Sequence, residues 1–256
     1  MKRIAYDLET DGLLHELTKI HCVSLMDLDD PSKTPLLYHD TPDIEPCHGD
    51  IREAMDILDQ AELVVAHNNL GFDNEVVKKL YGVELAVDKC FDTIVASRVV
   101  FSDLRDRDFA RRDADPEFPG KYTGSHALGA WGYRLGEAKG DYDGGWSTFN
   151  QDMATYALQD VVVTEKLYRY LLDRLPEPKP MGPMELEMQF AAICEEMNRT
   201  GVQIDRPALQ TLLETLEGRL ADLESEIQAL FPPEYHEYKP YPSGKPRMMF
   251  CKVRNG

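Results

Sequence analysis

Residues 3–13 read RIAYDLETDGL, an apolar run that ends in two carboxylates before a turn at Asp11 and Gly12. The run predicts a β-strand, in which successive side chains point to opposite faces. Asp7 and Glu9 therefore share one face, where two like charges cost free energy unless a cation lies between them. The alternative is a strand that ends in a solvated acidic loop, and this stretch alone is consistent with both interpretations. Asp11 is typical of a turn.

The segments after this stretch predict an α/β fold. Apolar runs separated by turn residues predict an antiparallel meander, after which helical and buried-strand patterns alternate. This order predicts one mixed five-stranded sheet, with parallel and antiparallel strands, flanked by helices. The expected strands cover residues 4–8, 22–26, 34–38, 63–66 and 90–92, and the expected helices cover 51–60, 72–81 and 93–101.

The remainder of the chain is expected to be mostly helical. Residues 105–122 are rich in charge, Gly and Pro, which predicts a mobile loop. Four prolines within residues 175–183 end a helical pattern and predict a linker. The expected helices cover 125–135, about 150–175, 184–199 and 207–230, with an irregular tail from Phe231. We therefore expect a domain over 1–175, a linker over 176–183 and a helical pair with its tail over 184–256.

Composition and charge restrict the class of protein. A hydrophobic content of 43% in 256 residues supports a well-packed core. The sequence has no apolar run long enough to span a membrane and no signal-peptide pattern, so we expect a cytoplasmic protein. Five scattered cysteines without CxxC spacing argue against a disulfide framework or a thiolate zinc site.

The net charge of −18 argues against a sequence-independent nucleic-acid clamp, which would neutralise phosphates with Lys and Arg. Positive charge still gathers over residues 98–112 and 239–254. Such a patch can contact phosphate even in an acidic protein, although solvated surface charge is the more common meaning of such a run.

Two acidic residues farther along the chain extend the carboxylate pattern. Asp73 follows the polar loop 67–72 at the start of a predicted helix, where an acid can simply interact with the helix dipole. Asp160 lies one helical turn after Tyr156. An acid in a long helix is usually solvated, but the apolar residues 161–163 carry this part of the helix towards the core.

Four carboxylates without a matching His or Cys cluster favour Mg²⁺ or Mn²⁺ over Zn²⁺. Two such ions about 3.5 to 4 Å apart can activate water and stabilise both oxygens of an in-line displacement at phosphorus. The expected chemistry is phosphodiester hydrolysis, in which the hydroxyl of Tyr156 orients the attacking water. The alternative for Tyr156 is a packed aromatic ring on an amphipathic helix.

Three motifs resemble those of the tyrosine-bearing branch of the DEDD exonuclease superfamily, which has the RNase H-like fold. They are Asp7-Leu8-Glu9-Thr10, Asn69-Leu70-Gly71-Phe72-Asp73 and Tyr156-x-x-x-Asp160. Residues 124–128, 130–136 and 159–164 further resemble the proofreading domain of family A DNA polymerases from T-odd lytic phages. The resemblance covers roughly residues 1–175, and the helical pair over 183–230 resembles, less specifically, the start of that polymerase's thumb.

The resemblance implies 3′-to-5′ exonuclease action on a DNA 3′ end with two divalent cations, Mg²⁺ or Mn²⁺. It implies that Tyr156 positions the water and that four residues are metal ligands: Asp7, Glu9, Asp73 and Asp160. Thr10, Leu13 and Asn69 match positions that hold the terminal nucleotides. Leu13 would be an apolar wedge against the last base, although an apolar residue after a turn can also belong to the core.

The chain lacks the palm and fingers of those polymerases, so we expect no nucleotide polymerisation by this chain alone. The expected partners are a single-stranded or frayed DNA 3′ end and the remaining polymerase module, in the host cytoplasm if a phage encodes the protein. Two alternatives stay open. One is an exoribonuclease of the same superfamily, which would need to recognise the 2′-hydroxyl. The other is a catalytically idle domain whose helical pair docks a separately encoded polymerase fragment.

Overall fold

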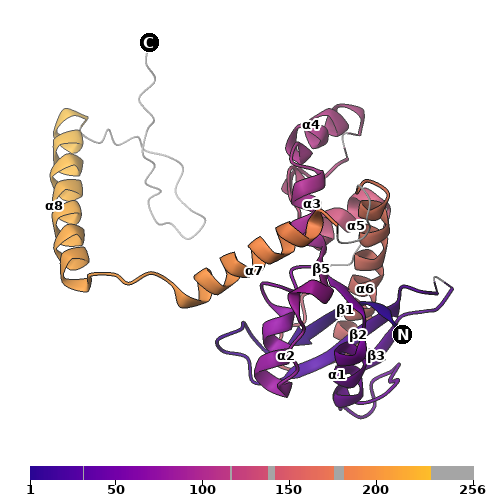
Figure 1. Cartoon of the computed structure of the whole chain (residues 1–256). Helices are drawn as coiled ribbons and strands as arrows, with labels where there is room; N and C mark the ends of the chain where they lie inside the picture. The colour runs from indigo at the N-terminus through magenta and orange to yellow at the C-terminus, as the bar shows by residue number, and fades with distance from the viewer. Residues whose placement is uncertain (31, 116, 138–141, 176–181, 232–256) are drawn as a thin grey trace, which may run out of the picture. The chain divides into compact units, whose positions relative to one another are not determined.

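The computed structural model describes residues 1–30, 32–115, 117–137, 142–175 and 182–231 (Figure 1). The chain divides into two compact units, Met1–Thr200 and Gly201–Gly256. None of the described helices is both long and apolar enough to cross a membrane.

A mixed five-stranded sheet forms the centre of the first unit, with the strand order β3-β2-β1-β4-β5. The strands are β1 (Arg3–Thr10), β2 (Ile20–Asp27), β3 (Leu36–Tyr38), β4 (Leu63–Ala66) and β5 (Cys90–Asp92). Antiparallel pairing joins β1 to β2 and β2 to β3, whereas β1 to β4 and β4 to β5 are parallel. The predicted meander and the mixed sheet are therefore confirmed, and β1 is the central strand.

Helices cover the sheet, and several begin at side chains that cap them. In the first unit they are α1 (Ile51–Gln60), α2 (Asp73–Tyr81), α3 (Thr93–Val100), α4 (Leu104–Ala114), α5 (Leu128–Leu135), α6 (Gln151–Leu172) and α7 (Met184–Thr200). Asp50 and Glu53 form a reciprocal capping box at the start of α1. The side chain of Asn150 accepts the N–H of Met153 at 2.9 Å and so caps α6. The long helix α6 contacts β1, β2 and β4 and brings its residues over the central strand.

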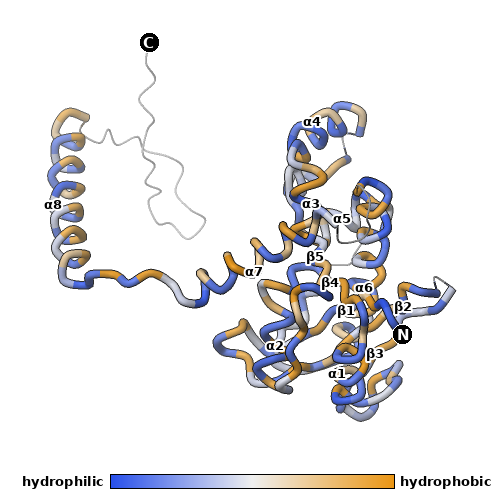
Figure 2. The backbone as a smooth tube through the Cα atoms, in the orientation of Figure 1, coloured by the Kyte–Doolittle hydropathy of each residue, from blue (hydrophilic) through white to orange (hydrophobic). Residues whose placement is uncertain are grey.

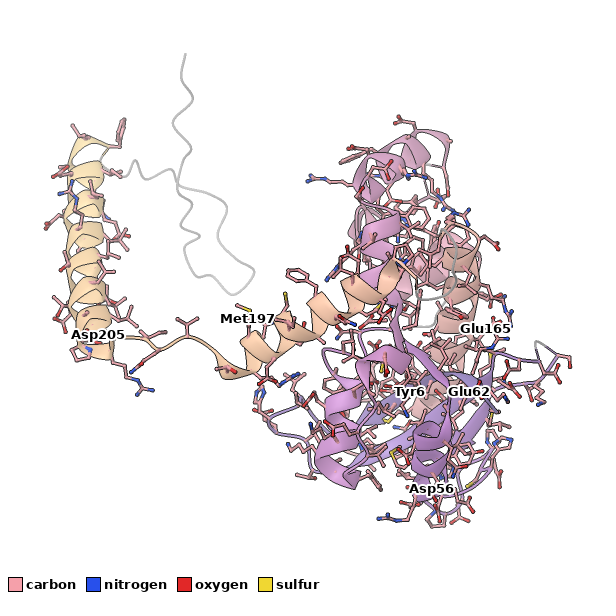
Figure 3. All side chains as sticks on the ribbon, viewed as in Figure 1. Tyr6, Asp56, Glu62, Glu165, Met197 and Asp205 are labelled. Carbon is pink, nitrogen blue, oxygen red and sulfur yellow. The ribbon has the colours of Figure 1, made fainter. Side chains whose placement is uncertain are left out.

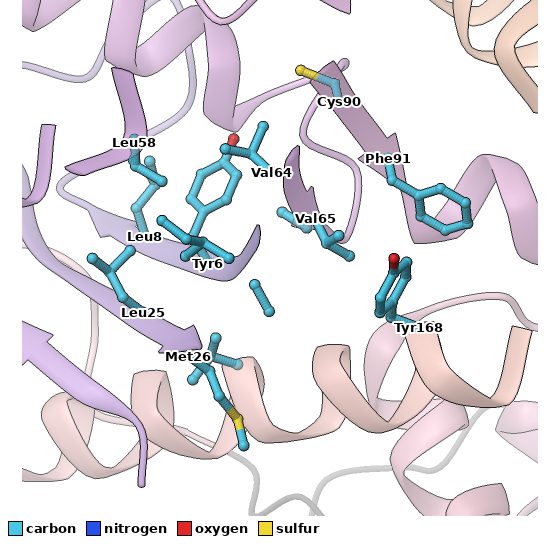
Figure 4. Packing of buried hydrophobic residues seen from close by; sticks show 14 of the residues in the cluster. Tyr6, Leu8, Leu25, Met26, Leu58, Val64, Val65, Cys90, Phe91 and Tyr168 are labelled. Carbon is cyan, nitrogen blue, oxygen red and sulfur yellow. The ribbon is translucent and has the colours of Figure 1, made fainter. Parts of the chain in front are cut away.

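The apolar core lies between the sheet and these helices. Figure 4 shows Tyr6 and Leu8 of β1 close to Leu58 of α1. At the other end of the cluster, Phe91 of β5 packs edge-to-face on Tyr168 of α6 with ring centroids 5.1 Å apart (Figure 4). Apolar packing therefore fixes the central strand on the face that carries Tyr6 and Leu8.

The prediction of a mobile loop over residues 105–122 is wrong, because α4 and a short 3₁₀ turn at Gly120–Tyr122 occupy this region. Asp108 of α4 is buried and accepts two hydrogen bonds from the guanidinium of Arg134, at 2.7 and 3.1 Å. It also accepts the N–H of Gly124 at 2.8 Å. The charges of this segment thus have tertiary partners, which local composition does not reveal.

The helix α7 belongs to the first unit. Its residues Met184 and Met188 are buried within the main core. The compact unit therefore ends after Thr200, beyond the linker predicted over 176–183, of which 176–181 lie outside the described residues. The assignment of 184–256 to the start of a thumb stays a prediction, and most of its predicted irregular tail, 232–256, also lies outside the described residues.

In the second unit, α8 (Arg206–Leu230) is capped by Asp205, which accepts the N–H of Ala208 at 3.0 Å. Orange and blue bands alternate along this helix in Figure 2, as expected of an amphipathic pattern. One apolar stripe is exposed and spaced alternately by four and three residues: Leu209, Leu213, Leu216, Leu220, Leu223, Ile227 and Leu230. We call this stripe the α8 seam, and its spacing is that of a helix packed against another helix.

Candidate metal centre

Three carboxylates converge where β1 ends. Each of Asp7, Glu9 and Asp160 offers an oxygen that lies within 4.8 Å of the others. Glu9 and Asp160 are buried, and Asp7 is partly buried. A buried group of three acids is costly without a cation, and an all-oxygen donor set suits a hard divalent ion such as Mg²⁺. The donor set therefore fits the predicted metal, and the interpretation as a solvated acidic loop is wrong.

The contact between β2 and α6 brings Asp160 to the strand. Ser24 of β2 lies opposite Asp7 in the β1–β2 register and is fully buried. Its hydroxyl donates to the backbone carbonyl of Ala157 at 2.9 Å, and the carbonyl of Asp7 lies 3.3 Å away. Ala157 precedes Asp160 by less than one helical turn. Ser24 was missed by the sequence interpretation, and a small hydroxyl inside a buried strand was the available signal.

Asp73 lies at the start of α2 and is outside the group of three carboxylates. Burial raises its pKa to about 7, and Asp92 adds to the rise, whereas the backbone N–H groups of Asp73 and Leu8 lower the pKa. The carboxyl group therefore faces the strand at Leu8. A cation close to it would favour the ionised form, and its role as a fourth ligand stays a prediction.

Asp92 was not singled out from the sequence, yet it holds the loop that leads to Asp73. One carboxylate oxygen accepts the N–H groups of Asn68 and Ile94, each at 2.9 Å, and the other accepts the N–H of Leu70 at 3.2 Å. Asp92 is nearly fully buried, and this burial raises its pKa. The signal in the sequence was an aspartate between a strand and a helix, which is a common N-cap.

Tyr156 lies one turn before Asp160 on α6 and is partly buried. Its ring contacts those of Tyr142 and Trp146, at centroid distances of 5.7 and 6.2 Å. The interpretation as a packed aromatic is therefore correct for the ring. The water-orienting role of the hydroxyl is compatible with this packing and stays a prediction.

The three predicted substrate residues have different surroundings. Thr10 is buried, and its hydroxyl donates to the carbonyl of Gly12 at 2.8 Å, which closes the turn after β1. Leu13 is 64% exposed, so the alternative interpretation, in which Leu13 belongs to the core, is wrong. Asn69 is fully buried. Burial raises the pKa of the Tyr6 hydroxyl, and the side-chain amide of Asn69 opposes part of this rise. The contacts of these residues with nucleotides stay predictions.

The turn that carries Leu13 is held from both ends. Asp11 accepts the N–H groups of Thr18 and Lys19 at 2.8 and 3.1 Å, which confirms its predicted role in the turn. Slight burial opposes ionisation, but the hydroxyl of Thr18, together with these backbone N–H groups, lowers the pKa of Asp11 to about 2. From α2, the ammonium of Lys79 donates to the carbonyl of Leu14 at 2.7 Å. Leu13 is thus an exposed apolar side chain on an anchored turn.

The fold is that of the RNase H-like exonucleases. The solved structure of Brucella melitensis NrnC with bound Mg²⁺ matches with a TM-score of 0.53 and 18% identity over 80% of this chain and 90% of NrnC. NrnC bound to pGG matches over the same shares with a TM-score of 0.54. No protein-family model matches the chain.

Sequence similarity identifies the relatives more narrowly. The chain is 31% identical to the DNA-directed DNA polymerase of Enterobacteria phage T3, over 98% of this chain and 39% of that polymerase. It is 30% identical to the DNA-directed DNA polymerase of Escherichia phage T7, over 99% of this chain and 40% of that polymerase. The chain is therefore homologous to these phage polymerases and spans about two fifths of their length.

Proposed function

We propose that this chain is a metal-dependent 3′-to-5′ exonuclease that hydrolyses the terminal phosphodiester of DNA. It would act as the proofreading part of a phage replicative polymerase, in the host cytoplasm. The observation that carries the proposal is the convergence of Asp7, Glu9 and Asp160 on an RNase H-like sheet. Homology to the T3 and T7 polymerases supports DNA as the substrate.

In this proposal the acidic residues hold two divalent cations, Mg²⁺ or Mn²⁺, with Asp7, Glu9 and Asp160 as ligands and Asp73 as the fourth. When bound, the cations supply the charge that stabilises the attacking and leaving oxygens at phosphorus. The Mg²⁺ bound in the NrnC structure supports this choice of metal. Tyr156 orients the attacking water through its hydroxyl.

The residues of the turn after β1 position the DNA end. Leu13, exposed on an anchored turn, packs against the last base, and Thr10 keeps the turn closed. Asn69 would contact the terminal nucleotide only after its buried side chain turns outwards. The net charge of −18 leaves little electrostatic attraction for a polyanion. Apolar contacts with bases therefore have to supply much of the free energy of DNA binding.

We further propose that the remaining polymerase module covers the α8 seam. The T3 and T7 polymerases extend well beyond the part that this chain matches, and the match includes the region of α8. The seam is exposed among the described residues, and its heptad-like spacing suits a helix as the partner. A palm-and-fingers polypeptide supplied separately should therefore bind this chain, and replacing Leu216 and Leu223 by Glu should abolish that binding, measured by co-elution.

A labelled-substrate assay tests the nuclease function. The chain is incubated with single-stranded DNA labelled internally, or with RNA of the same sequence, in Mg²⁺ or in chelator. We expect stepwise shortening of DNA that stops in chelator and in Asp7→Ala/Glu9→Ala. The matched control is Asp56→Ala/Asp59→Ala, which removes two exposed acids from α1, one of them labelled in Figure 3.

Each alternative has its own outcome in this assay. Shortening that persists in Asp7→Ala/Glu9→Ala contradicts the metal centre. Faster cleavage of RNA supports the exoribonuclease. An unmutated chain that is inactive on both substrates but still binds the polymerase module supports the idle docking domain.

A further inference from the structure

An aromatic cluster flanks the predicted water-orienting residue. Trp146 contacts Tyr156 in an edge-to-face arrangement with ring centroids 6.2 Å apart. Tyr142 contacts both rings, at 5.7 Å from Tyr156 and 5.1 Å from Trp146. Trp146 is 43% exposed, so one side of the indole packs on the cluster while the other remains accessible. The position of the Tyr156 ring therefore depends on residues that precede α6.

The segment that carries this cluster is anchored to the start of α6. The hydroxyl of Tyr142 donates to the carbonyl of Gly145 at 2.8 Å and accepts from the amide nitrogen of Asn150 at 2.8 Å. The side-chain oxygen of Asn150 accepts the N–H of Met153, and this hydrogen bond caps α6. One amide thus connects the aromatic segment with the helix that carries Tyr156.

A second anchor joins the segment to the sheet. The carbonyl of Trp146 lies 2.8 Å from the Nε2 atom of His21 in β2, and His21 is buried. The imidazole stacks on Phe149 with ring centroids 6.0 Å apart. His21 adjoins Cys22, which pairs with Glu9 in the β1–β2 register. The backbone at Trp146 is therefore held by the strand that also pairs with the carboxylate-bearing strand.

We propose that Trp146 is a positioning residue for the exonuclease reaction, which holds the ring of Tyr156 so that the hydroxyl can orient the attacking water. This inference rests on the proposed function. A tyrosine that is only partly buried on a helix has alternative rotamers, and the indole ring packed against it restricts them. Displacing an orienting group by about 1 Å can slow a reaction about 100-fold, so a contact outside the metal centre can control the rate.

A double-mutant cycle tests this role, with Trp146→Ala, Tyr156→Phe and the combined variant measured on single-stranded DNA. We expect Trp146→Ala to lower kcat about tenfold while KM changes less than about twofold. In the Tyr156→Phe background, which lacks the hydroxyl, the same change should have no further effect on kcat. Trp146→Phe retains an aromatic ring and should restore at least half of the lost rate.

Several outcomes overturn the inference. Additive effects of the two substitutions, or an effect mainly on KM, would mean that Trp146 stacks on a base of the substrate instead. An unchanged kcat in Trp146→Ala or in Tyr156→Phe would also contradict the positioning role. If Trp146→Ala lowers the melting temperature strongly, Trp146→Leu and Trp146→Phe replace it. A Leu variant as active as the Phe variant then contradicts the need for an aromatic ring.

The control variant is Phe109→Ala, which removes another exposed aromatic ring, 46% exposed on α4, and should leave kcat unchanged. Failure of the proposed function has a different signature. In that case the unmutated chain does not shorten DNA in Mg²⁺ at all. Failure of the inference alone leaves an active chain whose rate depends on Asp7 and Glu9 but not on Trp146.

Discussion

One face of β1 carries Tyr6 and Leu8, and the other carries Asp7 and Glu9. On the first face, Tyr6 is fully buried and its hydroxyl donates to the side chain of Asn74 at 2.6 Å. On the second face, the carboxylates meet Asp160 of α6. Burial of one large apolar side chain contributes about 1.5 to 3 kcal/mol. The apolar face therefore holds the strand in place against the repulsion that the acidic face creates, and each face can be changed separately.

The largest expected effect comes from Asp160→Ala on the acidic face. We expect the rate of DNA shortening to fall about 1,000-fold, because the metal centre loses a ligand. The melting temperature without metal should stay the same or rise, since one of three close like charges is removed. Mg²⁺ should raise the melting temperature of the unmutated chain but not of this variant.

The control for this prediction is Asp152→Ala, which removes an exposed acid from the first turn of the same helix. It should leave the rate and the response to Mg²⁺ unchanged. A large fall in the melting temperature of Asp160→Ala would instead assign this residue to the stability of the fold and remove the contrast between the faces.

Leu8→Ala changes the apolar face. Leu8 is 5% exposed within the main core, so the substitution should lower the free energy of unfolding by about 2 to 5 kcal/mol. The rate per folded molecule should stay within about threefold, because Asp73 meets the backbone N–H of Leu8 and the substitution changes only the side chain. Denaturant unfolding measures the first quantity, and kcat corrected for the folded fraction measures the second. Leu186→Ala, at a 70% exposed position, is the control with little effect on either.

Ser24→Ala tests the contact between β2 and α6 that brings Asp160 close to β1. Loss of a buried hydrogen bond should lower the free energy of unfolding by about 1 kcal/mol. Because this bond sets the position of Asp160 relative to β1, kcat should fall about tenfold as well. Ser97→Ala removes a similar buried hydroxyl, which donates to the carbonyl of Ile94 at 3.0 Å in α3. Equal stability losses with equal kcat values in the two variants would show that Ser24 has only a structural role.

The sequence predicted the parts of the molecule that depend on local pattern. The alternation of apolar and polar residues over 3–10 determines which side chains share a face. The strand β1 and the closeness of Asp7 and Glu9 could therefore be predicted from this alternation alone. Asp160 was found because a carboxylate before an apolar run is unusual in a helix. Asp73 was singled out from its place at the start of a predicted helix, and the structure places it beside Leu8 and outside the group of three carboxylates.

The missed features depend on partners that are distant in sequence. The helix α4 forms in a charge-rich segment because Asp108 pairs with Arg134, which lies 26 residues away. Ser24 contacts a carbonyl 133 residues away, and Trp146 contacts His21 across 125 residues. Propensity and periodicity describe neighbours within a few turns, so they contain no information on such contacts.

The smallest expected effect lies on the turn beyond both faces of β1. Leu13→Ala should change the free energy of unfolding by less than about 0.5 kcal/mol, because the side chain is 64% exposed and its turn is held by Asp11 and Lys79. Loss of an apolar contact with the terminal base should raise KM about threefold to tenfold, since one stacked or packed base contributes about 1 kcal/mol or more. The value of kcat should change less than twofold, and Glu16→Ala on the same turn should leave KM unchanged. A fall in kcat without a change in KM would place Leu13 with the acidic face, as a residue that aligns the scissile bond rather than one that holds the end of the strand.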